Sequence, residues 1–362
     1  MSCSMKKRII MHVDLNAFFA SAEERAHPGY RGKPLVVGAD PKHGSGRGVV
    51  STASYEARKY GVRSGMPISK AWKLCENKSC IFVPVNFRLY TEVSERVMKI
   101  LKAHADKFEQ LGIDEAFLDI TAKVGSFEAS SEIAKSIKKE LLEKEGLTCS
   151  IGVGPNKAVA KIASDFKKPD GLTIVRPDEV EKFLAPLPVD SLWGVGKKTT
   201  VVLDKMGIKT VGDLAHTDPS MLASRFGKSG LWFYNASRGI DSSDVIEERE
   251  PKSFGRETTF EKDTVDWPMV FSVLSGLSEE VHSEVRDSKY TFRTVEIKMR
   301  FEDFETHTHS KTLKFRTDSF DILSNTARAL LEPFLYSDKK IRLIGVRVSN
   351  LTRGEKQKTL FD

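Results

Sequence analysis

The chain has 362 residues, which is too long for one compact core and predicts about two to four domains. Hydrophobic residues make up 40% of it and charged residues 30%, and no apolar run reaches the roughly 18 residues of a membrane span. We therefore expect a globular protein without a membrane partner. A net charge of +7 and a pI near 9.0 favour a polyanionic partner, foremost a nucleic acid, with an acidic protein surface as the alternative.

The N-terminal residues and the cysteines indicate a cytoplasmic location. Residues 1–8 lead directly into an apolar run and lack the pattern of a secretory signal. The four cysteines are irregularly spaced. Cys75 and Cys80 have four residues between them and no second Cys or His pair nearby, which argues against a zinc site. We therefore expect a reducing, cytoplasmic environment.

The first half of the chain reads as strands and helices around one insertion. In chain order, the pattern predicts a strand at 8–14, a helix at 87–103, two strands around Asp114, a helix at 130–145, a strand at 147–153 and a short helix at 157–164. The insertion covers about residues 18–84 and is rich in Gly, Lys and Arg. Without it the order is β-α-β-β-α-β, the split βαβ pattern of an α+β fold.

Three carboxylates lie at the ends of these strands. Asp114 and Glu115 separate the apolar runs 107–113 and 116–121, which places both at the exposed tip of a hairpin. Asp14 ends the first strand, and the split βαβ pattern brings that end beside the hairpin. Mg²⁺ takes oxygen ligands, and two such ions about 3.5–4 Å apart serve in-line displacement at phosphorus. The pattern predicts a two-metal site; acids that are simply solvated are the alternative.

Residues 186–214 read as two short helices joined by a tight turn that contains Gly194 and Gly196. Glycines let the backbone approach a phosphate closely, and the N-terminus of the following helix offers free N–H groups to it. Lys197 and Lys198 add positive charge at this point. The pattern resembles a helix-hairpin-helix motif that binds the DNA backbone. An ordinary turn between core helices is the alternative.

A polar segment at 239–252, which contains Pro251 and lacks periodicity, is the best candidate for a linker. Beyond it, the pattern predicts strands at 253–260, 292–302, 309–316 and 340–351 and helices at 267–287 and 319–335. In 294–301 polar and apolar residues alternate, with Lys298 and Arg300 beside Glu296 on the polar face. A sheet covered on one face by two helices could present this polar face to a DNA backbone. A solvated face is the alternative.

Together these motifs resemble the Y-family DNA polymerases of the DinB, translesion type, in the form known from archaea. The resemblance runs from about residue 8 to residue 351. The segments that carry it are VDLNAFFA (13–20), STASYEARKYGV (51–62), IDEAFLD (113–119), the helix and lysine of 157–171, KSFGR (252–256) and IRLIGVR (341–347).

The resemblance implies an α+β right-hand polymerase. Its domains would be a ferredoxin-like palm at 1–17 and 85–175, small fingers at 18–84, a helix-hairpin-helix thumb at 176–241, a linker at 242–251 and a β-α-β-β-α-β little finger at 252–352. The implied activity is template-directed addition of dNTPs to a primer 3′ end with low fidelity, on damaged templates as well. The implied partners are primer–template DNA and dNTPs, bound by a monomer.

The resemblance also implies roles for single residues. Asp14, Asp114 and Glu115 would be catalytic and, with the backbone carbonyl of Leu15, would hold two Mg²⁺ ions. The residues that it implies for nucleotide binding are Phe18, Phe19 as the steric gate against a 2′-hydroxyl, Thr52, Tyr55, Arg58 and Lys168. Those that it implies for DNA binding are Gly194, Gly196, Lys197, Lys198, Lys298, Arg300, Arg342 and Arg347.

Two positions depart from the family pattern, and the tail adds one further motif. Gly112 stands where a serine often precedes Ile-Asp-Glu, and Ala17 stands where a bulkier aromatic residue is frequent. Neither is a metal ligand, but Ala17 leaves open how tightly a nascent base pair is packed.

In the tail at 353–362, Gln357, Leu360 and Phe361 resemble a sliding-clamp-binding peptide. A frayed tail is the alternative.

Two other classes of protein compete with the polymerase. A structure-specific nuclease could also combine a helix-hairpin-helix with acid-bound Mg²⁺, but it has no incoming nucleotide for Tyr55, Arg58 and Lys168 to hold. A DNA-binding scaffold without activity would have no need for the complete set of three acids. The sequence therefore favours the polymerase.

Overall fold

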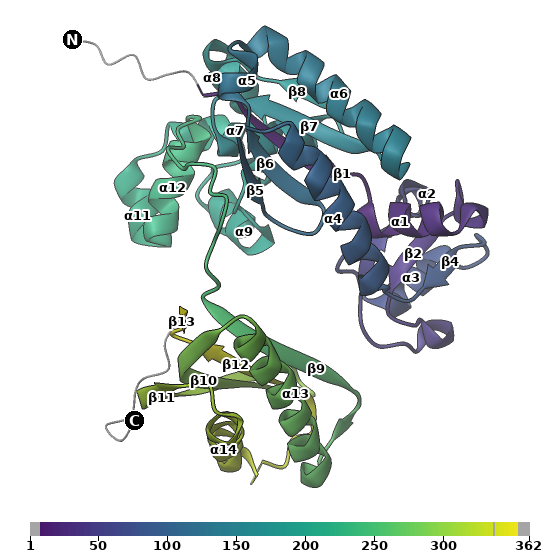
Figure 1. Cartoon of the computed structure of the whole chain (residues 1–362), viewed down its shortest axis with the longest axis vertical. Helices are drawn as coiled ribbons and strands as arrows, with labels where there is room; N and C mark the ends of the chain where they lie inside the picture. Colours follow the sequence, from purple (N-terminus) through teal and green to yellow (C-terminus); the bar gives the residue numbers. More distant parts are fainter. Residues whose placement is uncertain (1–7, 336, 354–362) are drawn as a thin grey trace. The chain divides into compact units, whose positions relative to one another are not determined.

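The computed structural model describes residues 8–335 and 337–353, which form two compact units (Figure 1). The first unit ends at Glu248 and the second begins at Arg249, within the linker expected at 242–251. No helix in the described part of the chain is long and apolar enough to cross a membrane.

The first unit is built on a five-stranded sheet with the order β5-β6-β1-β7-β8 (Figure 1). β1 is antiparallel to both of its neighbours, β6 and β7. The expected order β-α-β-β-α-β is confirmed and runs through β1, α4, β5, β6, α6 and β7. The bounds are β1 (Ile10–Leu15), α4 (Phe87–Ala103), β5 (Lys107–Gln110), β6 (Glu115–Asp119), α5 (Thr121–Val124), α6 (Phe127–Glu145), β7 (Cys149–Gly154), α7 (Lys157–Phe166) and β8 (Leu172–Ile174).

Alternation along β1 gives this sheet two buried faces. Met11 and Val13 belong to the core that α4 and α6 cover, whereas Ile10 points to the opposite face and packs against α7. The helix expected at 130–145 begins earlier, because the Ser126 side chain caps its N-terminus. Helices therefore cover both faces of the sheet, which leaves the ends of its strands as the place for a site.

The insertion between β1 and α4 folds around a small core of its own. Its three-stranded sheet has the order β3-β2-β4 and buries Val36, Ala57 and Ile68. The bounds are α1 (Phe18–Ala26), η1 (Pro28–Tyr30), β2 (Leu35–Gly38), η2 (Lys42–Gly44), β3 (Val50–Ala53), α2 (Tyr55–Lys59), α3 (Ile68–Cys75) and β4 (Ile81–Val83).

Cys75 and Cys80 form a disulfide, which differs from the reducing environment expected from the sequence. The reason lies in the local fold. Cys75 ends α3, and the chain turns back at once into β4, so the two Cα atoms lie 5.7 Å apart. Cys149 is a buried free thiol. The spacing of the cysteines in the sequence therefore did not predict that Cys75 and Cys80 form a disulfide.

The helical region after β8 packs around a separate core that includes Leu184, Leu203 and Leu214. The first helix expected in the helix-hairpin-helix is wrong: the chain forms a single 3-10 turn there, η4. Pro188 is the N-cap of that turn, and Gly194, with a φ of +87°, redirects the chain shortly after the turn ends, so no longer helix forms. The bounds are η3 (Pro177–Glu179), α8 (Val180–Leu184), η4 (Val189–Ser191), α9 (Lys197–Lys205), α10 (Val211–Ala215), α11 (Pro219–Phe226) and α12 (Lys228–Ser237).

The second unit repeats the order β-α-β-β-α-β in a five-stranded sheet, in which four strands follow the order β11-β10-β12-β9 and the short β13 pairs with β10. Helices α13 and α14 cover one face, and the apolar positions Val295, Ile297 and Met299 of β10 are buried in that core, as the alternation predicted. The bounds are β9 (Ser253–Thr264), α13 (Trp267–Asp287), β10 (Tyr290–Phe301), β11 (Thr306–Thr317), α14 (Phe320–Leu331), η5 (Glu332–Phe334), β12 (Ile341–Ser349) and β13 (Thr352–Arg353), which pairs with β10.

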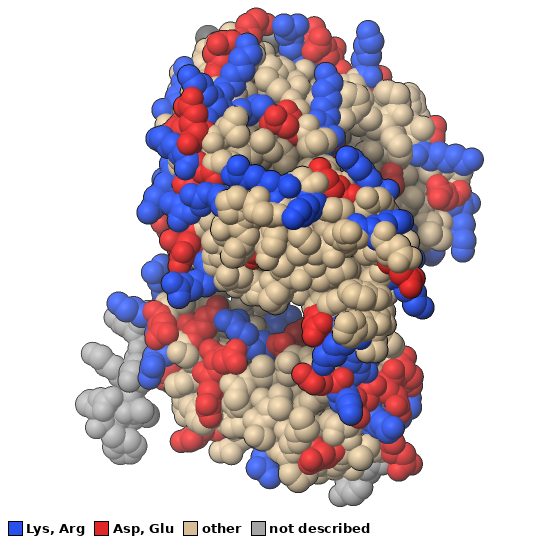
Figure 2. All heavy atoms as spheres, turned by 90° about the vertical axis from the view of Figure 1, so that its right-hand side faces the viewer, with Lys and Arg blue, Asp and Glu red and all other residues tan. Residues whose placement is uncertain are grey.

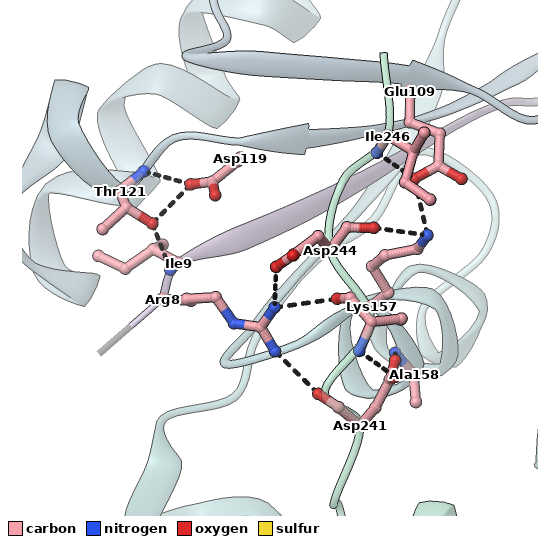
Figure 3. Close-up of polar contacts among 11 residues, drawn as sticks. Arg8, Ile9, Glu109, Asp119, Thr121, Lys157, Ala158, Asp241, Asp244 and Ile246 are labelled. Carbon is pink, nitrogen blue, oxygen red and sulfur yellow. Dashed lines mark hydrogen bonds and ion pairs between the residues drawn. The ribbon is translucent and has the colours of Figure 1, made fainter. Parts of the chain in front are cut away.

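The expected linker contains no helix or strand, but its first part is anchored to the first unit (Figure 3). The Arg8 guanidinium donates to the backbone oxygens of Asp241 and Ser243 at 2.8 and 2.9 Å, and it pairs with the Asp244 carboxylate at 3.2 Å. Val245 is buried in the core beneath α7. The polar composition of this segment did not predict that it is anchored, because backbone oxygens, which every residue has, make much of the contact.

A buried ion pair fixes the same segment from the side of α7. Lys157 Nζ lies 2.7 Å from Glu109 Oε2, and the two side chains are 2% and 1% exposed. Lys157 also donates to the Asp244 backbone oxygen at 3.2 Å, and Glu109 accepts from the Ile246 N–H at 3.0 Å (Figure 3). The chain as far as Ile246 is therefore part of the first unit.

We expect Lys157→Met to lower the free energy of unfolding by about 3–5 kcal/mol, because it removes the cation that faces a buried carboxylate. The double variant Glu109→Leu/Lys157→Met removes both charges and should recover most of this loss. As a control, Lys135→Met breaks an exposed pair with Glu132 and should cost at most about 1 kcal/mol. Denaturant unfolding measures all three, and equal losses in the two single variants would contradict the role of the buried pair.

Candidate active site

The three carboxylates predicted from the sequence come together at one end of the first sheet. Asp14 of β1 lies opposite Glu115, the first residue of β6, in the antiparallel register. The turn between β5 and β6 places Asp114 beside them, and the Asp114 backbone oxygen accepts a 2.9 Å hydrogen bond from the Leu15 N–H. The sheet thus unites residues that are far apart in the sequence.

The two neighbouring acids of the turn have pKa values shifted in opposite directions. Burial, followed by the charges of Asp14 and Glu115, raises the pKa of Asp114 to about 6. A hydrogen bond with His12 outweighs the burial of Glu115 and, with the contact to Lys161, lowers its pKa to about 2. Asp114 therefore stands in a concentrated negative field that a bound cation would relieve.

The donor set fits hard divalent cations. Asp14, Asp114 and Glu115 offer the carboxylate oxygens that Mg²⁺ prefers. Among residues 8–335 and 337–353, no three acidic, His or Cys side chains already converge on one ion position. Lysine ammonium groups instead contact two of the acids: Lys168 Nζ lies 2.8 Å from Asp14 Oδ1, and Lys161 Nζ contacts Glu115 Oε2. The three acids thus form a place that favours bound positive charge, and two lysine side chains already contact it.

A cavity of about 280 Å³ opens beside these carboxylates. Most of the residues predicted to bind metal and nucleotide line it, although they come from separate elements of the five-stranded sheet and of the insertion. The lining residues are Asp14, Leu15, Ala17, Phe18, Ser51, Thr52, Tyr55, Arg58, Ser64, Asp114 and Lys168. The cavity therefore combines acids with cations, a combination suited to a phosphate that arrives with metal ions.

Helix α2 places two polar side chains at this cavity. The Ser54 side chain caps this helix, so Tyr55 and Arg58 lie about one turn apart on the same face. The Arg58 guanidinium lies 4.6 Å from the centroid of the Tyr55 ring, and its Nε donates to the Ala53 carbonyl at 3.0 Å. Burial raises the pKa of the Tyr55 hydroxyl, which therefore stays protonated and able to donate at neutral pH.

The two neighbouring phenylalanines are placed differently. Phe18 begins α1, lines the cavity and is 2% exposed, so it is also a core residue. Phe19 stacks on Tyr90, with ring centroids 4.2 Å apart, and is not among the residues that line the cavity. The assignment of Phe19 as the steric gate stays a prediction, and Phe18 is its nearest competitor.

The sequence analysis did not single out two residues that touch the acids predicted to bind metal. His12 Nε2 lies 3.2 Å from Glu115 Oε2, and Lys161 of α7 contacts the same oxygen. The sequence did indicate that His12 lies near the acids, because it stands two residues before Asp14 and therefore on the same face of β1. Nothing in the local sequence connects Lys161 with Glu115, because only the packing of α7 against the sheet brings them together.

The residues predicted for DNA binding in the first unit lie on its surface. Gly196 is the N-cap of α9, and no side chain of the described residues caps this helix. Its first turn carries the exposed Lys197 and Lys198, and Gly194 with its left-handed φ turns the chain just before it. The backbone N–H groups at the start of α9 thus have two cations beside them.

The residues predicted for DNA binding in the second unit lie on β10 and β12. Lys298 and Arg347 border a depression of about 430 Å³. Acidic or polar residues of the same sheet contact all four: the pairs are Lys298–Glu257 at 2.7 Å, Arg347–Glu296 at 3.7 Å, Arg342–Asp263 at 3.8 Å and Arg300–Thr306 at 2.8 Å. On the face that Figure 2 draws, basic and acidic side chains are interspersed on both units.

Comparison with known proteins defines the class. Residues 13–165 match the impB/mucB/samB family, residues 251–360 match the C-terminal domain of that family, and residues 190–241 match the thumb domain of DNA polymerase-iota. The chain belongs to the Y-family DNA polymerases of the DinB type, and it is an enzyme of the translesion polymerase class.

Individual relatives span nearly the whole chain. DNA polymerase IV of Methanoculleus marisnigri is 51% identical over 347 residues, which cover 96% of this chain and 95% of the relative. DNA polymerase IV 2 of Methanosarcina mazei is 46% identical, over 99% of this chain and 96% of the relative. A solved Y-family DNA polymerase chimera of Dbh and Dpo4 matches with a TM-score of 0.87 and 37% identity, over 96% of this chain and 100% of that chain. The expected right-hand polymerase fold is confirmed.

Proposed function

We propose that this polymerase adds dNTPs to the 3′ end of a primer on template DNA, uses two Mg²⁺ ions and copies damaged templates with low fidelity. One observation carries the proposal: Asp14, Asp114, Arg58 and Lys168 line a single cavity, so acids for metal and cations for phosphate face the same space. A related solved structure, 35% identical with a TM-score of 0.69, is an insertion ternary complex of Dbh DNA polymerase. That relationship supports primer–template DNA and dNTPs as the ligands.

In this proposal Asp14, Asp114, Glu115 and the backbone carbonyl of Leu15 hold the two Mg²⁺ ions. The ions, when bound, supply the positive charge that lowers the pKa of the primer 3′-hydroxyl and neutralises the leaving pyrophosphate. Burial, and after it the charges of Asp14 and Glu115, raise the pKa of Asp114, and a cation bound at this place would offset both effects.

The cations and hydroxyls that line the cavity bind and orient the triphosphate. Arg58 can donate two parallel N–H bonds to phosphate oxygens, and the hydroxyls of Tyr55 and Thr52 add single donors. Lys168 adds a point charge. Phe19 is proposed as the gate against a 2′-hydroxyl, next to Phe18, which lines the cavity at the start of α1.

Primer–template DNA is assigned to surfaces outside the cavity. The turn from Gly194 to Gly196 and the adjoining Lys197 and Lys198 meet backbone phosphates at the N-terminus of α9. Lys298, Arg300, Arg342 and Arg347 hold the duplex on the second unit. The domains are then the palm (1–17 and 85–175), fingers (18–84), thumb (176–241) and little finger (252–352), and the enzyme acts as a monomer.

The proposed low fidelity has one structural support besides the family. Ala17 lines the cavity with a small side chain. A small residue at this wall packs the nascent base pair less tightly than an aromatic side chain would, so mismatched pairs meet less steric resistance.

Primer extension with Mg²⁺ and dNTPs tests the proposed function. On an undamaged template and on one with a single blocking lesion, we expect the primer to lengthen and to pass the lesion. A nuclease would shorten the labelled strand, and a scaffold would leave it unchanged, so either result would reject the proposal.

The clamp-binding tail gives a further prediction, on residues outside the described part of the chain. Deleting residues 357–362, which include Gln357, Leu360 and Phe361, should leave distributive synthesis intact and abolish stimulation by a sliding clamp. Tethering raises the local concentration of the enzyme at the primer end without changing its chemistry. The variant Leu360→Ser/Phe361→Ser should match the deletion, and Lys358→Ala should match the full chain. Equal stimulation of all forms by loaded clamp would reject the tail as the docking peptide.

A further inference from the structure

Both protein contacts of the Glu115 carboxylate fall on the same oxygen. Lys161 Nζ donates to Oε2, and His12 Nε2 lies 3.2 Å from that atom. The other oxygen, Oε1, forms no hydrogen bond or ion pair with any residue that the structure describes. One oxygen is thus engaged by the protein, and the other is left for a ligand.

His12 is itself fixed by its surroundings. Its side chain is 0% exposed, and its ring packs on Phe117 with centroids 4.7 Å apart. Its Nδ1 lies 2.8 Å from Ser164 Oγ, and Ser164 Oγ in turn lies 2.7 Å from the Lys161 backbone oxygen. Side chains of β1 and α7 therefore converge on one carboxylate oxygen of β6, and all of them are held in place by packing.

Two lysines contact the catalytic acids, but only one of them lines the cavity. Lys168 pairs with Asp14 and also lines the cavity, so an incoming phosphate can reach it. Lys161 is not among the lining residues, and its Nζ lies 3.4 Å from His12 Nε2 and 5.9 Å from the centroid of the Trp193 ring. A nucleotide in the cavity therefore leaves the contact between Lys161 and Glu115 in place.

We infer that Lys161 and His12 are positioning residues of the polymerase reaction, which fix Oε2 of Glu115 so that Oε1 is presented to the metal. The inference rests on the proposed function, because it takes Glu115 as a metal ligand. A glutamate side chain loses rotamer freedom whenever it binds a metal, and a carboxylate that is already held has lost much of that freedom beforehand. Partners that orient a metal ligand in this way typically contribute about 10–100-fold in metal affinity or activity.

The test is the Mg²⁺ dependence of single-nucleotide addition in Lys161→Met, Lys161→Arg and the control Lys167→Met, which changes an exposed lysine at the end of the same helix. Lys161→Met should raise the Mg²⁺ concentration at half-maximal rate by about 10–100-fold and change the rate at saturating Mg²⁺ much less. Lys161→Arg, which keeps the charge and the donors, should restore most of the affinity. Lys167→Met should behave as the wild type.

A second readout does not depend on turnover. Mn²⁺ binding is followed by electron paramagnetic resonance in a complex with DNA that ends in a dideoxynucleotide and with the next dNTP, and it should weaken in Lys161→Met and His12→Gln. A variant that only loses stability would have a lower melting temperature, but the Mg²⁺ concentration at its half-maximal rate would not change selectively. If Lys161→Met does not fold, Lys161→Gln replaces it.

The outcomes separate the inference from the proposed function. Unchanged Mg²⁺ dependence and unchanged Mn²⁺ binding in the Lys161 variants, with an active wild type, would overturn the positioning role and leave the polymerase proposal standing. A wild type that adds no nucleotide in Mg²⁺ would instead reject the proposed function.

Discussion

Asp14→Ala and Glu115→Ala are each expected to slow nucleotide addition by roughly 10³-fold or more while primer–template affinity stays nearly unchanged. Metal charge held at these acids is worth several kcal/mol at the reacting phosphate, and each step of about 1.4 kcal/mol is a factor of ten in rate. The proposed DNA contacts of α9, β10 and β12 do not involve either acid. Rapid-quench kinetics measures the first quantity and fluorescence anisotropy with labelled DNA measures the second.

A matched control separates this effect from a general effect of removing acids. Glu132 on α6 is exposed and pairs only with the neighbouring Lys135 among the described residues, so Glu132→Ala should keep the wild-type rate. A near wild-type rate in Asp14→Ala or Glu115→Ala would mean that the metal assignment is wrong. Similar melting temperatures of the variants would exclude unfolding as the cause of a lost rate.

Phe19→Ala is expected to raise incorporation of ribonucleotides relative to deoxynucleotides by roughly 10–100-fold. Forcing an additional group into a packed space costs about 1–3 kcal/mol, and removal of the ring relieves that cost for the 2′-hydroxyl alone. Use of dNTPs should change little, because the metal ligands and the triphosphate-binding residues stay in place. The ratio of kcat/KM for the two nucleotide types measures the effect.

Neighbouring aromatic residues provide the controls for the gate. Phe87 lies edge-on to Phe19, with ring centroids 6.1 Å apart, and is 66% exposed, so Phe87→Ala should leave the ratio unchanged. Phe18 lines the cavity but is buried, so Phe18→Ala should mainly lower stability, by about 3–5 kcal/mol. An unchanged ratio in Phe19→Ala with an altered ratio in Phe18→Ala would move the gate to Phe18.

The convergence of Asp14 with Asp114 and Glu115 could be predicted because topology alone dictates it. Once the order β-α-β-β-α-β is recognised, the first strand must lie beside the central hairpin, whatever the loops do. Helix α4 begins and ends at the predicted residues, since its apolar period is clear and Asn86 caps it. These features depend on local patterns that can be recognised directly in the sequence.

Other features depended on contacts that no local pattern records. The anchoring of the linker uses backbone oxygens of Asp241 and Ser243, which every sequence possesses. The contact of Lys161 with Glu115 depends on how α7 packs against the sheet, and the disulfide of Cys75 and Cys80 on a turn between α3 and β4. Tertiary packing decided each of them.

In the proposed reaction, Asp14, Asp114 and Glu115 hold two metal ions beside a bound nucleotide. The most direct test is a crystal structure of the enzyme with dideoxy-terminated primer–template DNA, a non-hydrolysable dNTP and Mn²⁺, with anomalous scattering used to locate the metal. We expect two anomalous peaks about 3.5–4 Å apart, in contact with these three acids and the triphosphate. A nucleotide bound in the cavity with no anomalous peak at the three acids would contradict the account.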